Sequence, residues 1–276
     1  MNELRPRNIQ FEGMSRCNAS CTFCPYTDMK RQKGEMTDDL FHKIIKEGKQ
    51  LHSKIYSPFL NGEPFLHPKL FEWMDYMEKE GVWVSLYTNA SLLTKEKIDR
   101  LCNYKNISHV VCSINATTKE VHEKLMHLKN YDQIVENVRY LLDKKPYFRV
   151  ICSMALLEEN KHQVLDFKKM WGSRHARIAQ FVNWGGYKHN PIEAETWGEK
   201  HFCHHLKNMY VLWDGRVCLC CQDFDGKFIL GDLNKQTIKE VWDNAKWIRD
   251  KHVEGKFDEL DLCRDCNLNC KKVVSY

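Results

Sequence analysis

The sequence predicts an α/β protein in which a mainly parallel sheet is covered by helices and followed by a small cysteine-rich module. Two observations lead to this prediction. Short apolar segments alternate with segments of helical periodicity from residue 8 to residue 183, which is the pattern of repeated β-α units. The alternation then stops, and seven of the 13 cysteines follow after residue 200.

Six strand and six helix candidates form the first part of the chain. The strand candidates are apolar runs at 8–12, 55–60, 82–88, 107–114, 147–154 and 177–183. Helical periodicity occurs at 37–51, 68–80, 94–103, 118–127, 131–144 and 160–171. Thr37 opens the first helix as a side-chain cap, and the acids Asp38 and Asp39 suit a helix N-terminus.

A polar stretch over 186–200 has no clear periodicity and is interpreted as a linker between domains 1–185 and 201–276. In the second domain, segments 208–213 and 216–221 flank Asp214-Gly215, a dipeptide that favours the tight turn of a β-hairpin. Thr237 and Glu240 form a capping-box pattern that opens a helix reaching about residue 253.

Composition limits the function classes. The 42 basic and 37 acidic residues are spread along the chain, which does not favour nucleic-acid binding. A tight basic group follows the first cysteines and is predicted to be a solvated loop; it consists of Lys30, Arg31 and Lys33. No apolar run approaches the roughly 20 residues that span a bilayer. Without a secretory leader, so many cysteines predict a reducing, cytoplasmic location.

Cys17, Cys21 and Cys24 lie within eight residues, directly after the first strand candidate. A structural zinc site has four closed ligands, and an iron-sulfur cluster held by only three thiolates keeps one iron open to another ligand. A zinc site and unligated core thiols remain the alternatives at this point.

This loop, with Phe23 before its third cysteine, resembles the CxxxCxxC motif of the radical S-adenosylmethionine (SAM) superfamily. Asn61-Gly62-Glu63-Pro64 is similar to the family's GGEP motif, with asparagine in the place of the first glycine. Thr88-Asn89 is similar to its TNG motif, with Ala90 in the place of glycine, and Ser113 and Asn115 end the fourth strand where the family often has polar residues.

The resemblance implies a partial (β/α)6 TIM-like barrel over 1–185, in agreement with the six β-α units. It implies a [4Fe-4S] cluster on the three cysteines, with SAM bound to the open iron. One electron from an external reductant, such as flavodoxin or ferredoxin, would cleave SAM and give a 5'-deoxyadenosyl radical. The SAM-binding residues that it implies are Phe23, Asn61, Gly62, Glu63, Pro64, Thr88, Asn89, Ser113 and Asn115.

The C-terminal cysteines resemble the SPASM or twitch modules of radical SAM enzymes, which bind auxiliary [4Fe-4S] clusters. The resemblance implies one auxiliary cluster on Cys203, Cys221, Cys263 and Cys266. On a strand, Cys218 and Cys220 would share one face and Cys221 would take the other. Cys221 is preferred as the position nearest the strand end, and the choice among the three stays open. A zinc ribbon on the same thiols is the alternative.

The expected reaction is hydrogen abstraction from a small polar substrate, such as a sugar or aminocyclitol, with the auxiliary cluster accepting an electron. Three alternatives remain. One is a radical epimerase with Cys152, Cys218 or Cys220 as hydrogen donor. The second is a peptide-modifying maturase, against which the barrel's start near Met1 argues. The third, outside the enzymes, is an iron-sulfur electron carrier.

Overall fold

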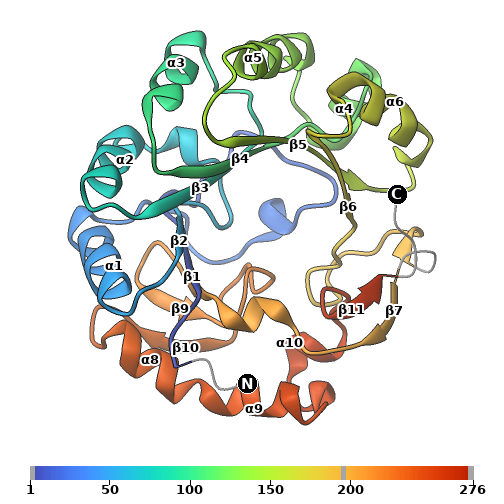
Figure 1. Cartoon of the computed structure of the whole chain (residues 1–276). Coiled ribbons are helices and arrows are strands. Elements are labelled where there is room, and N and C mark those ends of the chain that lie inside the picture. Colours follow the sequence, from blue (N-terminus) through green and yellow to red (C-terminus); the bar gives the residue numbers. More distant parts are fainter. Residues whose placement is uncertain (1–3, 194–196, 273–276) are drawn as a thin grey trace.

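The computed structural model describes residues 4–193 and 197–272. All six predicted strands of the first domain form and pair in parallel in sequence order. The predicted partial (β/α)6 barrel is confirmed, because the strands curve around a centre without closing the sheet (Figure 1). The strands are β1 (Asn8–Phe11), β2 (Ile55–Ser57), β3 (Trp83–Thr88), β4 (Ile107–Ser113), β5 (Arg149–Leu156) and β6 (Ala176–Gln180).

Helices cover the outer face of this sheet (Figure 1). The strands alternate, so that Val110, Cys112 and Met154 pack in the core, whereas Ser113 and Ser153 line a cavity on the inner face. Thr37 caps the first helix by accepting a hydrogen bond from the Leu40 backbone nitrogen. The helices are α1 (Asp38–Gln50), α2 (Leu70–Lys79), α3 (Lys95–Asn103), α4 (Lys119–Met126), α5 (Tyr131–Asp143) and α6 (Val164–Trp171).

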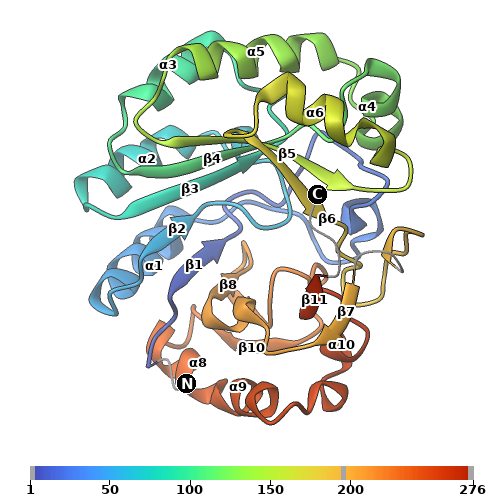
Figure 2. The ribbon, with the colours of Figure 1, turned by 45° about the vertical axis from the view of Figure 1, so that its right-hand side comes forward.

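The C-terminal module extends the same sheet from its other edge, which the sequence did not predict. The expected hairpin forms from β8 (Met209–Val211) and β9 (Arg216–Cys218), and β10 (Ile229–Asp232) adds a third strand. β8 pairs in parallel with β1, and Figure 2 shows the module lying below the barrel strands. The cysteine-rich module is therefore joined to the barrel by backbone hydrogen bonds.

The predicted helix from Thr237 is divided at Ala245 into α8 (Ile238–Asn244) and α9 (Lys246–Val253). The Thr237 capping box is formed. The last residues of the predicted linker form β7 (Trp197–Lys200), which pairs with β11 (Cys270–Lys272). Residues 194–196 of the linker, and 1–3 and 273–276 of the predicted domains, lie outside the described ranges. Short helices are η1 (Pro25–Asp28), η2 (Pro64–Leu66), η3 (Lys161–Gln163), η4 (His204–Lys207), η5 (Phe257–Glu259) and α10 (Asp261–Arg264).

Arg31, which forms a buried ion pair with Glu12 of the barrel, also joins the two parts. The Arg31 guanidinium donates to both carboxylate oxygens of Glu12 at 2.8 and 2.5 Å, and its Nε donates to the Phe224 carbonyl at 2.7 Å. The prediction that Arg31 belongs to a solvated loop was wrong, because its side chain is only 5% exposed. Across the described residues, no helix is long and apolar enough to cross a membrane.

Candidate functional site

A cavity of about 240 Å³ opens at the carboxyl ends of the barrel strands, and we call it the strand-end cavity. Cys17, Cys21, Cys24 and Glu63 all line it. Of the other residues predicted to bind SAM, Pro64 is the exception: it is buried and begins η2 behind Glu63. The remainder all line the cavity: Phe23, Asn61, Gly62, Thr88, Asn89, Ser113 and Asn115.

Glu63 is held by the end of β3. Its carboxylate accepts hydrogen bonds from Thr88 Oγ1 at 2.7 Å, the Asn89 backbone nitrogen at 2.8 Å and the Phe65 backbone nitrogen at 3.2 Å. Burial raises the pKa of this carboxyl group to about 7, although these hydrogen bonds oppose the shift. The two sequence motifs are thus one structural unit, in which the strand end orients the acid.

Gly62 permits a close backbone approach beneath this acid. A Cβ at this position would lie 2.2 Å from the Met14 carbonyl oxygen and 2.8 Å from that of Arg16. The Glu63 backbone nitrogen donates to the Arg16 carbonyl at 2.9 Å. The turn therefore packs against the chain that leads into the cysteine loop, which brings Glu63 and the three thiols to one cavity.

Ala90 and Asn115 follow β3 and β4 in the left-handed backbone region, with φ of 62° and 64°. This conformation favours glycine, so Ala90 is strained where the resembling motif has a glycine. The Asn115 side chain bridges the strand ends: its Oδ1 accepts from the Ala155 nitrogen at 2.8 Å.

Several lining residues were missed by sequence reasoning. Period-two alternation, extended from the strands, would have placed Tyr87 and Ser153 on the inner face. Trp184 gave no local signal, because it reaches the cavity only through the fold, donating from Nε1 to the Phe23 carbonyl at 3.0 Å. The missed residues are Ala19, Tyr26, Phe59, Leu60, Tyr87, Met126, Ser153, Ala155 and Trp184.

The side chains fit a three-cysteine cluster and an amino-acid ligand. Three thiols and a carboxylate face one cavity, and within the described part of the chain the buried Asn61 Nδ2 at its edge has no hydrogen-bond partner. Burial raises the pKa of the Cys17 and Cys24 thiols to about 11. Because metals bind thiolates, cluster binding must release these protons.

A second group of thiols lies in the C-terminal module. Cys203, Cys263 and Cys266 line a small cavity of about 20 Å³ together with His252 and several leucines. Cys220 also lines this cavity, whereas the Cys221 thiol lies beside His205. Among 4–193 and 197–272, no three His, Cys, Asp or Glu side chains are arranged to hold a single metal ion.

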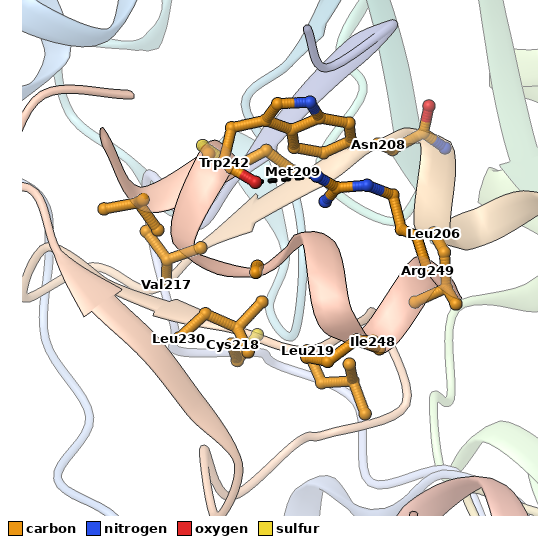
Figure 3. Close-up of a pocket in the computed structure, with 12 residues that line it drawn as sticks. Leu206, Asn208, Met209, Val217, Cys218, Leu219, Leu230, Trp242, Ile248 and Arg249 are labelled. Carbon is orange, nitrogen blue, oxygen red and sulfur yellow. Dashed lines mark hydrogen bonds between the residues drawn. The ribbon is translucent and has the colours of Figure 1, made fainter. Parts of the chain in front are cut away.

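The predicted strand at 216–221 is shorter than expected, because β9 ends at Cys218, so alternation does not separate Cys218, Cys220 and Cys221. Cys218 lies against Leu219 and Leu230 in an apolar cavity between the hairpin and α8 and α9 (Figure 3). Cys220 instead lines the cavity that holds Cys203. Cys220 and Cys221 therefore remain the candidates for the fourth ligand.

The predicted hydrogen donors for epimerisation are not placed at the strand-end cavity. Cys152 is fully buried in the core formed by the outer face of the sheet and its helices, because Ser153 takes the inward position. Cys218 and Cys220 line other cavities. In the part of the chain that is described, the thiols at the strand-end cavity are those of Cys17, Cys21 and Cys24.

An open α/β barrel with three thiols and an acid at its strand ends defines a candidate radical enzyme core, and comparison with known proteins agrees. Residues 11–170 match the model of the Radical SAM superfamily, and residues 203–267 match SPASM, an iron-sulfur cluster-binding domain. The chain belongs to the radical SAM superfamily and is an enzyme that uses SAM and [4Fe-4S] clusters, including an auxiliary cluster.

Two similar curated proteins differ in how much of them the chain covers. The S-adenosyl-L-methionine-dependent 2-deoxy-scyllo-inosamine dehydrogenase of Niallia circulans is 26% identical over 94% of this chain and 92% of its own length. The antilisterial bacteriocin subtilosin biosynthesis protein AlbA of Bacillus subtilis is 27% identical over 65% of this chain. The chain spans only 39% of AlbA.

Solved structures share the fold. BtrN in complex with AdoMet and 2-DOIA superposes with a TM-score of 0.68 at 21% identity, covering 97% of this chain and 94% of BtrN. Streptococcus suis SuiB bound to precursor peptide SuiA gives a TM-score of 0.74 at 14% identity, covering 95% of this chain and 71% of SuiB. At these identities the likeness is evidence for the fold alone.

Proposed function

We propose that the chain is a SAM-dependent dehydrogenase that oxidises a hydroxyl-bearing carbon of a small polar substrate. The observation that carries this proposal is the pairing of an open cysteine site with a second, buried one in a chain similar over nearly its whole length to an aminocyclitol dehydrogenase. A second cluster can accept the electron that remains on the substrate after hydrogen abstraction.

In this proposal Cys17, Cys21 and Cys24 hold the SAM-binding cluster, and Cys203, Cys221, Cys263 and Cys266 hold the auxiliary cluster. Glu63 binds the amino group of SAM through charge and hydrogen bonding, and Thr88 and Asn89 keep its carboxylate oriented. The domain limits 1–185, 186–200 and 201–276 are part of the same proposal.

When bound, the first cluster and SAM supply a 5'-deoxyadenosyl radical, using one electron from an external reductant such as flavodoxin or ferredoxin. A substrate carbon that bears a hydroxyl group loses its hydrogen atom to this radical, which becomes 5'-deoxyadenosine. The hydroxyl proton would leave to a base or to solvent, and the auxiliary cluster, when bound, would accept the remaining electron. The carbon becomes a carbonyl, and methionine is the other product.

Anaerobic reconstitution followed by incubation with SAM, reductant and a panel of aminocyclitols and sugars tests this proposal. We expect about eight irons per chain, since each cluster holds four, and one 5'-deoxyadenosine for each carbonyl formed. About four irons would refute the auxiliary cluster. In deuterated solvent, a product with deuterium on an inverted carbon and no carbonyl would instead identify an epimerase.

A peptide substrate is the second candidate, because the chain shares its fold with SuiB, which was solved with a precursor peptide. Adding peptides encoded beside the gene to the same panel separates the two. A mass loss of two hydrogens, or a new cross-link in a peptide, would replace the small-molecule proposal. The predicted cytoplasmic location agrees with the reducing conditions that both reactions need.

A further inference from the structure

Two histidines lie against the sulfurs of the C-terminal cysteine site. His252, in the last turn of α9, is 2% exposed, and its Nε2 lies 3.3 Å from Cys263 Sγ. His205, in η4, places its Nδ1 2.9 Å from the Tyr210 hydroxyl and 3.5 Å from Cys221 Sγ, and Gln222 Nε2 lies 3.4 Å from the Cys221 sulfur. Side-chain nitrogens thus lie beside two of the proposed ligands, Cys221 and Cys263.

The packing around His252 fixes its imidazole. The rings of Phe202 and Phe257 contact it edge to face, with centroids 6.1 and 5.0 Å away. His252 also lines the small cavity beside Cys203, Cys263 and Cys266. Its contact with Cys263 is therefore part of the wall of the proposed cluster site.

The direction of this hydrogen bond follows from the chemistry of a ligated sulfur. A metal-bound thiolate has no proton and can only accept, so Nε2 must carry the hydrogen. Within the described residues, His252 Nδ1 has no partner. A hydrogen on Nδ1 would leave a buried donor unpaired and turn the Nε2 lone pair toward the thiolate. A ring protonated at Nε2 alone meets both conditions, because it donates to the sulfur and leaves no N–H at Nδ1.

The cysteines of the strand-end cavity have a different environment. Cys17 Sγ lies 3.4 Å from the Ala19 backbone nitrogen and 4.0 Å from Asn89 Nδ2, and Cys21 Sγ lies 3.4 Å from the Met126 sulfur. No histidine contact to these sulfurs occurs in the part of the chain that is described. Side-chain donors with rigid rings are thus specific to the C-terminal site.

We infer that His252, together with His205 and Gln222, raises the reduction potential of the auxiliary cluster and so makes it the electron acceptor. Hydrogen bonds to the sulfurs stabilise the more negative, reduced cluster, and such bonds are among the factors that set cluster potentials. These three are positioning residues, because they act through the ligands. The inference rests on the auxiliary cluster of the proposed function.

The test is an anaerobic redox titration of the reconstituted full-length chain, monitored by electron paramagnetic resonance. The changes Cys17→Ala, Cys21→Ala and Cys24→Ala together leave only the auxiliary cluster to be observed. In this background His252→Leu removes the donor, and His252→Gln keeps a side-chain N–H. His204→Leu is the matched control, because His204 is exposed and its ring contacts are to His201 and Phe202.

We expect His252→Leu to lower the midpoint potential at unchanged iron content, with His252→Gln closer to the parent and His204→Leu equal to it. An unchanged potential in an iron-loaded His252→Leu protein would overturn the inference while leaving the auxiliary cluster intact. Absence of iron from the triple-cysteine parent would instead refute the proposed cluster, and the inference with it.

A second measurement does not depend on how the variants fold. In the parent protein labelled with ¹⁵N-histidine, pulsed resonance of the reduced auxiliary cluster should show a hyperfine-coupled histidine nitrogen. A spectrum without histidine coupling would overturn the inference.

Discussion

The two cysteine sites use the same ligand type in opposite surroundings. Cys17, Cys21 and Cys24 are partly exposed and face a cavity of about 240 Å³ that also contains a carboxylate. Cys203, Cys263 and Cys266 are buried around about 20 Å³, among leucines and a histidine. The strand-end cavity has space for a ligand beside the three thiols. The cavity beside Cys203 has little space for a further ligand.

Access and surroundings, rather than the thiols, therefore separate the two proposed roles. A missing fourth ligand and a nearby acid suit a cluster that binds SAM. Burial and hydrogen-bond donors to sulfur suit one that only stores an electron.

The largest effect is expected at the open site. Cys17→Ala should abolish 5'-deoxyadenosine formation and lower the iron content from about eight to about four per chain, because the first cluster loses a ligand. Iron analysis and product chromatography measure both. Cys102→Ala, which removes a partly exposed thiol of α3 outside both sites, is the control. SAM cleavage by the Cys17→Ala protein would remove the distinction between the two sites.

The fourth ligand of the buried site can be assigned by a matched pair of variants. Cys221→Ala should lose about four irons and substrate oxidation while 5'-deoxyadenosine still forms slowly, because the first cluster is intact. Cys220→Ala should keep both clusters. The reverse result would assign Cys220, whose thiol lines the cavity with Cys203.

Glu63→Gln should weaken SAM binding by about 10- to 100-fold, since a hydrogen bond to a charged group contributes about 1.5–3 kcal/mol. Because the pKa of Glu63 is raised to about 7, the binding carboxylate is lost as the pH falls below that value. SAM affinity of the parent should then fall by up to about tenfold per pH unit, whereas that of the variant should not follow this trend. Calorimetry between pH 8 and 6 measures the SAM affinity of both proteins. If the affinities of the parent and the variant changed with pH in parallel, the role of Glu63 would be contradicted.

The smallest effect concerns the backbone beside the open site. Ala90→Gly should raise the free energy of unfolding by about 0.5–1 kcal/mol, because glycine relieves the strain at φ 62°. Ala176→Gly, at the start of β6, should lower it by a similar amount. Denaturant titration compares the two, and equal destabilisation would show that Ala90 is not strained.

Much of the fold and of the open site followed from short stretches of sequence. The alternation of segments predicted all six strands of the barrel, since periodicity is local information. Cys17, Cys21 and Cys24 were recognised by spacing within one loop, and Glu63 by its motif. The hairpin around Gly215 and the Thr237 cap are likewise set by neighbouring residues.

Local sequence was thus enough for the six barrel strands, the class of enzyme and the loop that holds three thiols. Only the tertiary structure decided that β8 joins β1, that the end of β3 orients Glu63, and that His252 lies against Cys263. These contacts join residues distant along the chain, so no local spacing encodes them. Cys220 and Cys221 are an example. Strand alternation would have placed them on opposite faces, but β9 ends at Cys218, so tertiary packing sets the position of both side chains.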